Sequence, residues 1–378
     1  PLLICSLIVV VINKLAMGNY KHRSIPLLLF FSITITSFFG LTETMTGSYT
    51  GSESIYLYGL SFYTASLAYH FRDRTTLQVS DVLKISNPLL LITGPIALFI
   101  KSRRHVSFKR RINYYVPFLI IGIFYYQIIA TPLINLFPLL VKTDIASSLL
   151  FAVIFEIFVY TNFCGLSLII YALFGLLGYK VPLNFRQPFS STNVVEFWRG
   201  WHLSLSMVLK SLLYSPIRKK YPSYIAILAV YMASALWHGI SLNYLIWGCL
   251  HAAIFVISIY ALKKGAKLIP LLLLLVGIIL GRLLSADSTT ERLFEKLSFS
   301  YDGMSAFNSI AAAGGSTKAA LLIGLVVIMI EFFFQKHRLV AKRNYKFLRT
   351  PGAFTCILFM TILLIDSGVD GFAVYGQR

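Results

Sequence analysis

The sequence predicts an all-α membrane protein whose helices cross the bilayer many times. Of its 378 residues, 57% are apolar and only 13% are charged, and the mean hydropathy is +0.76. That charged share is about half of the share in a typical soluble domain. A soluble fold of this composition would expose large apolar patches, so lipid must be the solvent for most of the surface. Solid apolar runs such as residues 271–275 replace the alternation of a transmembrane β-barrel, which argues against that class.

The charge pattern gives an orientation and a count of spans. The net charge of +20 comes from 34 Lys and Arg against 14 Asp and Glu. The bases cluster at residues 14–23, 72–84, 101–111, 180–220, 263–267 and 336–349. Basic loops between apolar runs follow the positive-inside rule, so we expect anionic membrane lipids as the partner and no nucleic acid. Placing every cluster in the cytoplasm gives one membrane domain over residues 1–378, with both termini outside and about 10–11 transmembrane helices.

The apolar runs between these clusters are the expected spans. They cover residues 1–13, 27–41, 55–70, 112–140, 145–177, 269–284, 319–334 and 354–365, and a two-span hairpin at 223–262. We expect residues 1–13 to form a spanning helix rather than a removed signal peptide, because no basic flank precedes them.

Two stretches do not fit simple spanning. Residues 88–100 would reach roughly 20 Å as a helix, short of the ~30 Å hydrocarbon core, so we expect a re-entrant segment. Residues 185–221 mix polar, aromatic and basic side chains, which predicts amphipathic, partly buried helices on the cytoplasmic side.

His238 is the first candidate for chemistry. It lies in a Trp237-His238-Gly239 sequence near the turn of the predicted hairpin. A neutral imidazole at membrane depth can act as a general base, and Gly239 permits close approach of the backbone or a ligand. The alternative is a hydrogen-bonded core or interfacial histidine.

His202 is the second candidate. On a continuous helix, Trp198, Trp201 and His202 would share one face by their i, i+3, i+4 spacing, and Glu196 and Arg199 would be close enough to pair. The alternative here is an interfacial belt of aromatic side chains with snorkelling bases.

Two carboxylates within predicted spans, Glu156 and Glu331, keep a different class of protein open. Ionisable groups at lipid depth often serve as proton relays, so the chain could be a secondary transporter or flippase. That class predicts repeats in the hydropathy pattern, and none is visible. No zinc spacing or P-loop is present either, and no metal or bound cofactor is expected.

Six short stretches, read together, resemble one known family. They are NFRQPF at 184–189, EFWRGWHLS at 196–204, ALWHG at 235–239, GLSFYT at 59–64, TGPI at 93–96 and WGCLH at 247–251. This set is similar to the membrane-bound O-acyltransferase (MBOAT) family, and within it to the bacterial branch that acylates cell-envelope polysaccharides. The likeness covers about residues 55–300.

The resemblance implies a site as well as a fold. His238 matches the family's catalytic histidine and His202 the second histidine of this branch, which meet in a central tunnel through the membrane core. Trp237 and Trp201 would then line the tunnel and exclude water. The remaining residues of these motifs expected at the tunnel are Trp198, Arg199, Ser204 and Gly239. Leu168 and Ser211 stand where the branch has Asp, which keeps open a scaffold that has lost catalysis.

The resemblance also implies the reaction. An acyl group, most simply acetyl, would pass from a cytoplasmic thioester donor such as acetyl-CoA to a hydroxyl, with His238 as general base. D-alanyl transfer from a carrier protein to teichoic acid is the alternative. Bases at residues 199–220 would attract the phosphates of coenzyme A or an acidic carrier protein. The acceptor would be an extracytoplasmic glycan, often reached through a partner protein, and the location the bacterial inner (cytoplasmic) membrane.

Overall fold

The structure, a computed structural model, describes residues 25–26, 28–34, 53–73, 84–140, 144–286, 301–333 and 349–364. These residues are mostly helical, and their β-structure is a two-residue antiparallel pair, β1 (Lys101–Ser102) with β2 (Tyr179–Lys180). Five helices among them are long and apolar enough to cross a membrane. The prediction of an all-α polytopic membrane protein is thereby confirmed.

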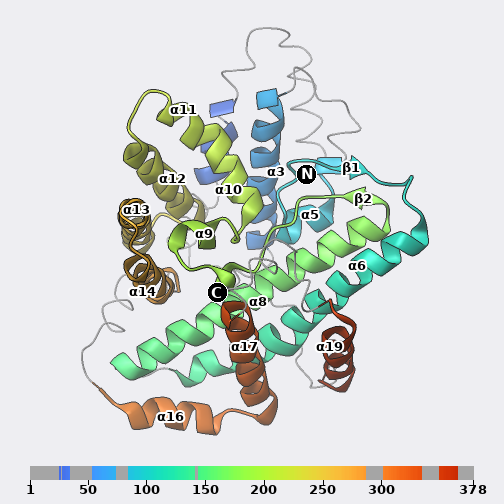
Figure 1. The fold of residues 1–378 in the computed structure, drawn as a ribbon, viewed down its shortest axis with the longest axis vertical. Helices are drawn as coiled ribbons and strands as arrows, with labels where there is room; N and C mark the ends of the chain where they lie inside the picture. Colours follow the sequence, from blue (N-terminus) through green and yellow to red (C-terminus); the bar gives the residue numbers. More distant parts are fainter. Residues whose placement is uncertain are drawn as a thin grey trace.

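The first two long helices lie side by side through the middle of the molecule (Figure 1). One is α6 (Phe108–Ile123), which continues through the π-helix η1 (Phe124–Ala130), α7 (Thr131–Leu133) and the 3-10 helix η2 (Ile134–Leu139). The other is α8 (Ile145–Leu176). The first helix matches the span predicted at 112–140, and α8 matches the span predicted at 145–177. Gly122 and Gly165 meet at the crossing, where a Cβ on either would lie 2.8 Å from the other's carbonyl oxygen. Only residues without a side chain allow this approach.

Asp144 starts α8 as its N-cap. Its carboxylate accepts hydrogen bonds from the amides of Ala146 (3.0 Å) and Ser147 (3.1 Å), which the first turn of a helix leaves unpaired. The amide of Asp302, which precedes α16 (Gly303–Ala312), donates to the same oxygen at 3.3 Å. Burial opposes ionisation, but these hydrogen bonds outweigh it and hold the pKa of Asp144 below its usual value.

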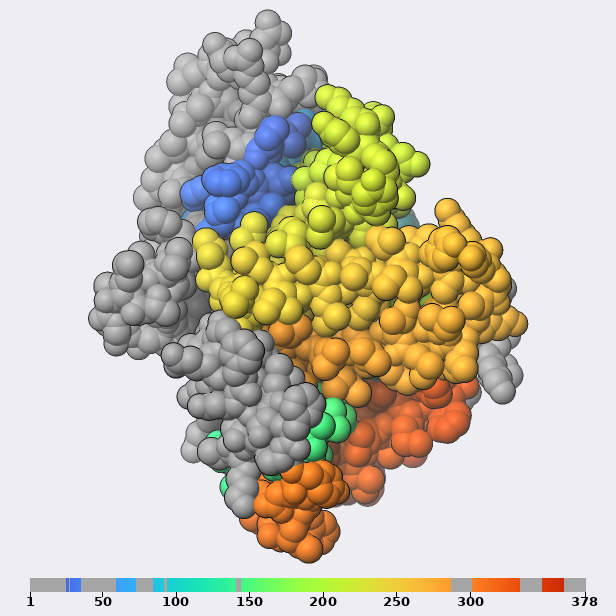
Figure 2. All heavy atoms as spheres, turned by 90° about the vertical axis from the view of Figure 1, so that its left-hand side faces the viewer, coloured from blue at the N-terminus to red at the C-terminus, as the bar shows by residue number. Residues whose placement is uncertain are grey.

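Three helices form a band on one face of the molecule (Figure 2, yellow to orange). They are α12 (Ser223–His238), α13 (Leu242–Lys263) and α14 (Leu268–Ser285), and the first two are the predicted hairpin. Large apolar side chains on the band stay exposed, including Ile257, Leu272, Leu275 and Val276. This is the pattern of a lipid-facing surface.

The predicted re-entrant stretch does not form a spanning helix. It begins as the short helix α5 (Pro88–Thr93) and continues as irregular chain in which Ile96 and Leu98 are buried. Buried irregular backbone needs hydrogen-bond partners, and it finds them here. The amide of Ile96 donates to Ser204 Oγ (3.1 Å), and the carbonyl of Ala97 accepts from Ser66 Oγ (2.8 Å), in α3 (Glu53–Asp73).

The predicted amphipathic stretch at 185–221 consists of short helices. In order they are η3 (Pro188–Ser190), α9 (Val194–Trp198), α10 (Leu203–Leu209), η4 (Lys210–Tyr214) and α11 (Ser215–Arg218). Their residues range from fully buried to exposed, as predicted. Two further helices pack against the central pair and match predicted spans: α17 (Gly315–Phe333), which also contacts η3, and α19 (Pro351–Leu364), beside α6.

The predicted number of 10–11 spans stays a prediction. Besides the five long helices, α12 and α19 are shorter apolar helices, and α3 covers the predicted span at 55–70. The expected spans at 1–13 and, for the most part, 27–41 lie outside the described residues, as do most of the basic clusters at 14–23, 72–84 and 336–349.

Candidate active site

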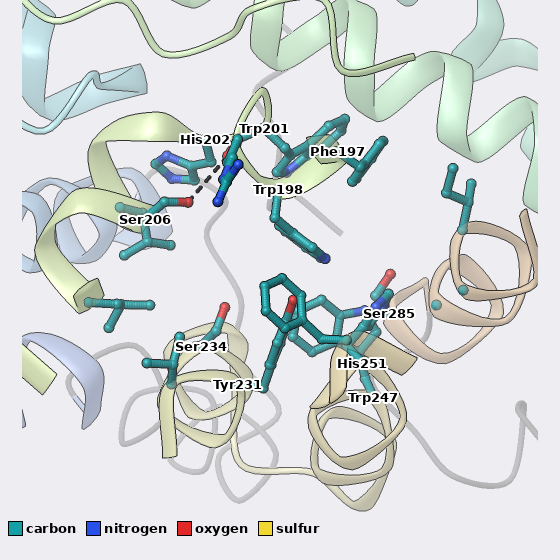
Figure 3. A pocket seen from close by; sticks show the side chains of 18 of the residues that line it. Phe197, Trp198, Trp201, His202, Ser206, Tyr231, Ser234, Trp247, His251 and Ser285 are labelled. Carbon is teal, nitrogen blue, oxygen red and sulfur yellow. Dashed lines mark hydrogen bonds between the residues drawn. The ribbon is translucent and has the colours of Figure 1, made fainter. Parts of the chain in front are cut away.

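A cavity of about 490 Å³ lies between the short helices α9 and α10 and the α12–α14 band. Its lining also includes residues of α8 and η4, so segments more than a hundred residues apart contribute to one space. In Figure 3, Trp198 and His202 lie on one side, and Tyr231, Trp247 and His251 on the other. His238 lines the same cavity, so both predicted histidines are brought together.

A buried hydrogen-bond network fixes His202. Its Nδ1 lies 3.1 Å from Asn184 Oδ1, which also accepts hydrogen bonds from the amide (3.3 Å) and hydroxyl (2.8 Å) of Ser204. The amide of Asn184 in turn donates to Ser167 Oγ at 3.2 Å. Because Asn184 Oδ1 can only accept, His202 donates through Nδ1, and Nε2 is left as the basic nitrogen of the ring.

Trp198, Trp201 and His202 do not share a helical face, which corrects the prediction. Helix α9 ends at Trp198, and His202 adopts a left-handed backbone conformation with φ of 41° as the N-cap of α10. Two backbone hydrogen bonds of 2.8 and 2.9 Å tie the 199–203 stretch to the chain at 184–186. These bonds to another segment replace the intrahelical bonds that a continuous helix would need, and they place Asn184 beside His202.

The expected pairing of Glu196 with Arg199 is not formed either. The Glu196 carboxylate accepts hydrogen bonds from the amide and hydroxyl of Thr192, both at 3.3 Å, across the first turn of α9. Arg199 is exposed and lines the cavity.

His238 is the last residue of α12 and lies at the predicted turn. Gly239 follows it with φ of 153°, which ends the helix. The His238 ring stacks near Tyr244 and meets the edge of Trp247, with both centroid separations 6.0 Å. His202 is close enough for a charge on either imidazole to act on the other.

Aromatic rings surround His251, the third histidine of the cavity. Its ring centroid lies 4.5 Å from that of Trp247, 5.5 Å from Trp198 and 6.0 Å from Tyr231. A Cβ on Gly281 of α14 would lie 2.5 Å from His251 Nε2, so only glycine fits below the ring. His251 is 5% exposed, and its Nδ1 has no hydrogen-bond partner.

Arg282 and Glu156 complete the wall as an ion pair between α14 and α8. Sequence reasoning did not select Arg282 or Tyr231. The signal for Arg282 was available, since it lies near the end of an otherwise apolar predicted span, where a charge is expensive. Tyr231 has no comparable signal, because an aromatic residue in an apolar helix is ordinary.

The remaining predicted site residues divide into two groups. Trp198, Arg199 and Trp201 line the cavity, whereas Trp237, Ser204 and Gly239 do not. Trp237 is 2% exposed and packs in a separate apolar cluster. Its neighbour His238 faces the cavity, and successive helical residues point about 100° apart.

Leu168 and Ser211, where the resemblance leads us to expect Asp, lie away from the cavity lining. Leu168 is 1% exposed within the main apolar core. The Ser211 hydroxyl donates to the carbonyl of Met207, 2.5 Å away, on the preceding turn of its own helix. Neither substitution removes a polar group from the cavity wall.

Comparisons with known proteins identify the matched segment. Residues 103–263 match the model of MBOAT, membrane-bound O-acyltransferase family. The peptidoglycan O-acetyltransferase of Helicobacter pylori is 34% identical over 98 residues, which are 25% of this chain and 18% of the relative. The teichoic acid D-alanyltransferase of Bacillus subtilis is 28% identical over 128 residues, 31% of this chain and 32% of the relative.

A longer match is to the probable alginate O-acetylase AlgI of Azotobacter vinelandii, 29% identical over 183 residues, which are 45% of this chain and 36% of the relative. The chain thus matches about a fifth to a third of the length of these curated relatives. Both candidate histidines and the cavity residues of α8–α13 fall within the matched segment. The resemblance that the motifs indicate is confirmed to this extent: residues 103–263 match the membrane-bound O-acyltransferase family model, and the relatives belong to cell-envelope acylation by their names.

Proposed function

We propose that the chain belongs to an O-acyltransferase that moves an acyl group from a thioester donor to a hydroxyl of a cell-envelope polysaccharide. The observation that supports this best is that His202 and His238 line one cavity. Aromatic side chains lie on both sides of that cavity (Figure 3). A base is needed to activate a hydroxyl, and aromatic side chains that exclude water limit hydrolysis of the thioester.

In the proposed step, His238 removes the proton from the acceptor hydroxyl. The hydroxyl oxygen then bonds to the thioester carbonyl carbon, the carbon–sulfur bond breaks, and the proton passes from His238 to the leaving thiolate. His202 lines the same cavity and supports this step, and Asn184 holds its ring in one orientation. The step needs no redox change and no metal.

Acetyl is the acyl group proposed first, because two of the three relatives described above are named as O-acetylating proteins. D-alanyl is the second candidate, from the relative named as a teichoic acid D-alanyltransferase. The cytoplasmic donor, the extracytoplasmic glycan, a partner protein that completes transfer, and the bacterial cytoplasmic membrane belong to the same proposal.

The test uses membranes from cells that express the whole protein together with the polysaccharide genes of its source. Labelled acetyl-CoA is supplied, and label in the glycan is measured for wild type and His238→Ala at equal protein level. Histidine 105, which is exposed and outside the cavity lining, provides the matched control His105→Ala. We expect label with wild type and the control, and loss of label on the order of a hundredfold or more with His238→Ala.

Label retained by His238→Ala would overturn the catalytic assignment. Label in none of the proteins would direct the same experiment to a D-alanyl carrier protein as donor. A secondary transporter or flippase would instead move its solute across sealed vesicles without acylating the glycan, and would depend on a proton gradient.

A further inference from the structure

Arg282 is a largely buried cation in the wall of the proposed active site. The cavity lining contains two other cations, Arg199 and Lys210, and both are exposed. The Arg282 side chain is only 14% exposed, and its partner Glu156 only 6%. Removing a charge from water costs free energy. The presence of Arg282 in the cavity wall therefore calls for a functional explanation.

Two contacts fix the position of the guanidinium. Its Nε donates to the Glu156 carboxylate across the α8–α14 interface. Its central carbon lies 5.0 Å from the centre of the Trp201 ring, a cation–π distance. Because Glu156 holds the edge of the guanidinium and Trp201 its face, the position of the positive charge is fixed before substrate binds.

That charge lies where the proposed reaction occurs. Trp201 directly precedes His202 in the chain, and Arg282 lines the same cavity as His202 and His238. Arg282 is also close enough for its charge to act on both His238 and His251. Gly281, beside it on α14, lets that helix approach the His251 ring closely.

We propose that Arg282 is a catalytic residue that stabilises the negative charge developing on the thioester carbonyl oxygen. When the acceptor oxygen bonds to the carbonyl carbon, the carbonyl electron pair moves to its oxygen. The carbon–oxygen double bond then reforms as the carbon–sulfur bond breaks and the thiolate leaves with the proton held by His238. A fixed cation beside that oxygen stabilises the charged intermediate more than the neutral thioester. This inference rests on the proposed acyl transfer.

Two other roles for Arg282 make different predictions. A purely structural ion pair requires Arg282 and Glu156 equally, because removing either one breaks the same salt bridge in the protein interior. A site for a donor phosphate requires Arg282 for binding of the donor rather than for turnover.

The experiment therefore breaks the same ion pair from each side. Arg282→Met and Glu156→Gln are compared in the membrane assay at varied acetyl-CoA concentration, with thermal unfolding measured in detergent. For Arg282→Met we expect kcat to fall about 100- to 1,000-fold with little change in KM, because the oxyanion exists only during turnover. Glu156→Gln keeps the guanidinium, so we expect a loss of no more than about tenfold.

The double variant Glu156→Gln/Arg282→Met tests the assignment without an unpaired buried charge. Removing both partners of a buried pair is often tolerated, so we expect it to unfold at a temperature close to that of wild type. It is nevertheless expected to stay as inactive as Arg282→Met. Arg282→Lys keeps a charge without the planar fork and is expected to lie between wild type and Arg282→Met.

Equal losses of kcat in the two single variants would overturn the assignment, as would a double variant with wild-type kcat. A rise in KM for Arg282→Met at unchanged kcat would also overturn it in favour of phosphate binding. If wild type transfers neither acetyl nor D-alanyl, the proposed function fails and the assignment with it. If wild type and Arg282→Met transfer equally, only the assignment fails.

Discussion

Two histidines of one cavity, His202 and His251, are held in place by different means. His202 is oriented by a hydrogen bond from Nδ1 to Asn184, within a network that extends to Ser204 and Ser167. His251 is oriented by its packing against Trp198, Tyr231 and Trp247, and its Nδ1 has no hydrogen-bond partner.

The difference separates proton chemistry from shape. A hydrogen bond to a fixed acceptor selects one tautomer, so His202 presents a defined basic nitrogen. Ring packing fixes the plane of an imidazole without selecting a tautomer, so His251 contributes mainly surface. We therefore interpret His202 as a ring held for the proton step together with His238, and His251 as part of the wall that shapes the space for the substrate.

The largest effects that test this comparison are expected in two alanine variants, one that loses activity and one that loses stability. We expect His202→Ala to lower transfer by about a hundredfold or more, because it removes a ring that acts in the proton step. His251→Ala is expected to lower transfer by less than tenfold per folded molecule, yet to destabilise the protein by about 3 kcal/mol, since it leaves a cavity among packed rings. The measurements are acetyl incorporation and thermal unfolding in detergent. A loss of activity for His251→Ala that equals the loss for His202→Ala would contradict the comparison.

The sequence was sufficient for the long helices, and it selected two histidines that the structure places in one cavity. Apolar runs bounded by basic clusters predicted α8 and α14 to within a residue or two, because length and hydropathy alone decide which segments cross lipid. The WHG turn predicted where α12 would end. The prediction of a helix across Trp198–His202 was wrong. Backbone hydrogen bonds to residues 184–186 replace the helical ones there, and no local sequence pattern reveals those bonds.

The rest of the cavity depends on contacts between distant segments. Arg282 pairs with Glu156, which lies 126 residues earlier, and local spacing cannot join them. The sequence treated Glu156 and Glu331 alike, whereas the structure places only Glu156 in the cavity lining. Packing determines which face of a helix lines the cavity. His238 therefore lines the cavity, whereas its neighbour Trp237 packs in an apolar cluster.

A smaller effect is expected from the support behind His202. Asn184→Leu removes the acceptor for His202 Nδ1 and for the Ser204 hydroxyl, so the ring loses its fixed orientation and tautomer. We expect transfer to fall tenfold to a hundredfold, because misplacing a reacting group by about 1 Å has effects of this size. Asn184→Asp keeps an acceptor at the same place and is expected to retain most of the activity lost in Asn184→Leu. The comparison would weaken if both variants transferred label as wild type does.

The smallest effect is expected at a buried carboxylate outside the cavity. Glu331 of α17 is 1% exposed and accepts a hydrogen bond of 2.6 Å from the Tyr160 hydroxyl of α8, so it joins two helices within the protein. Glu331→Gln keeps an oxygen that can accept from Tyr160. We therefore expect transfer within about twofold of wild type and an unfolding temperature close to that of wild type, because a hydrogen bond typically worth about 1 kcal/mol is retained. Transfer that collapses in Glu331→Gln, at unchanged folding and with a new dependence on the proton gradient, would instead favour a proton relay. The polar groups that matter to function would then extend beyond the cavity, and the contrast between His202 and His251 would no longer describe the site.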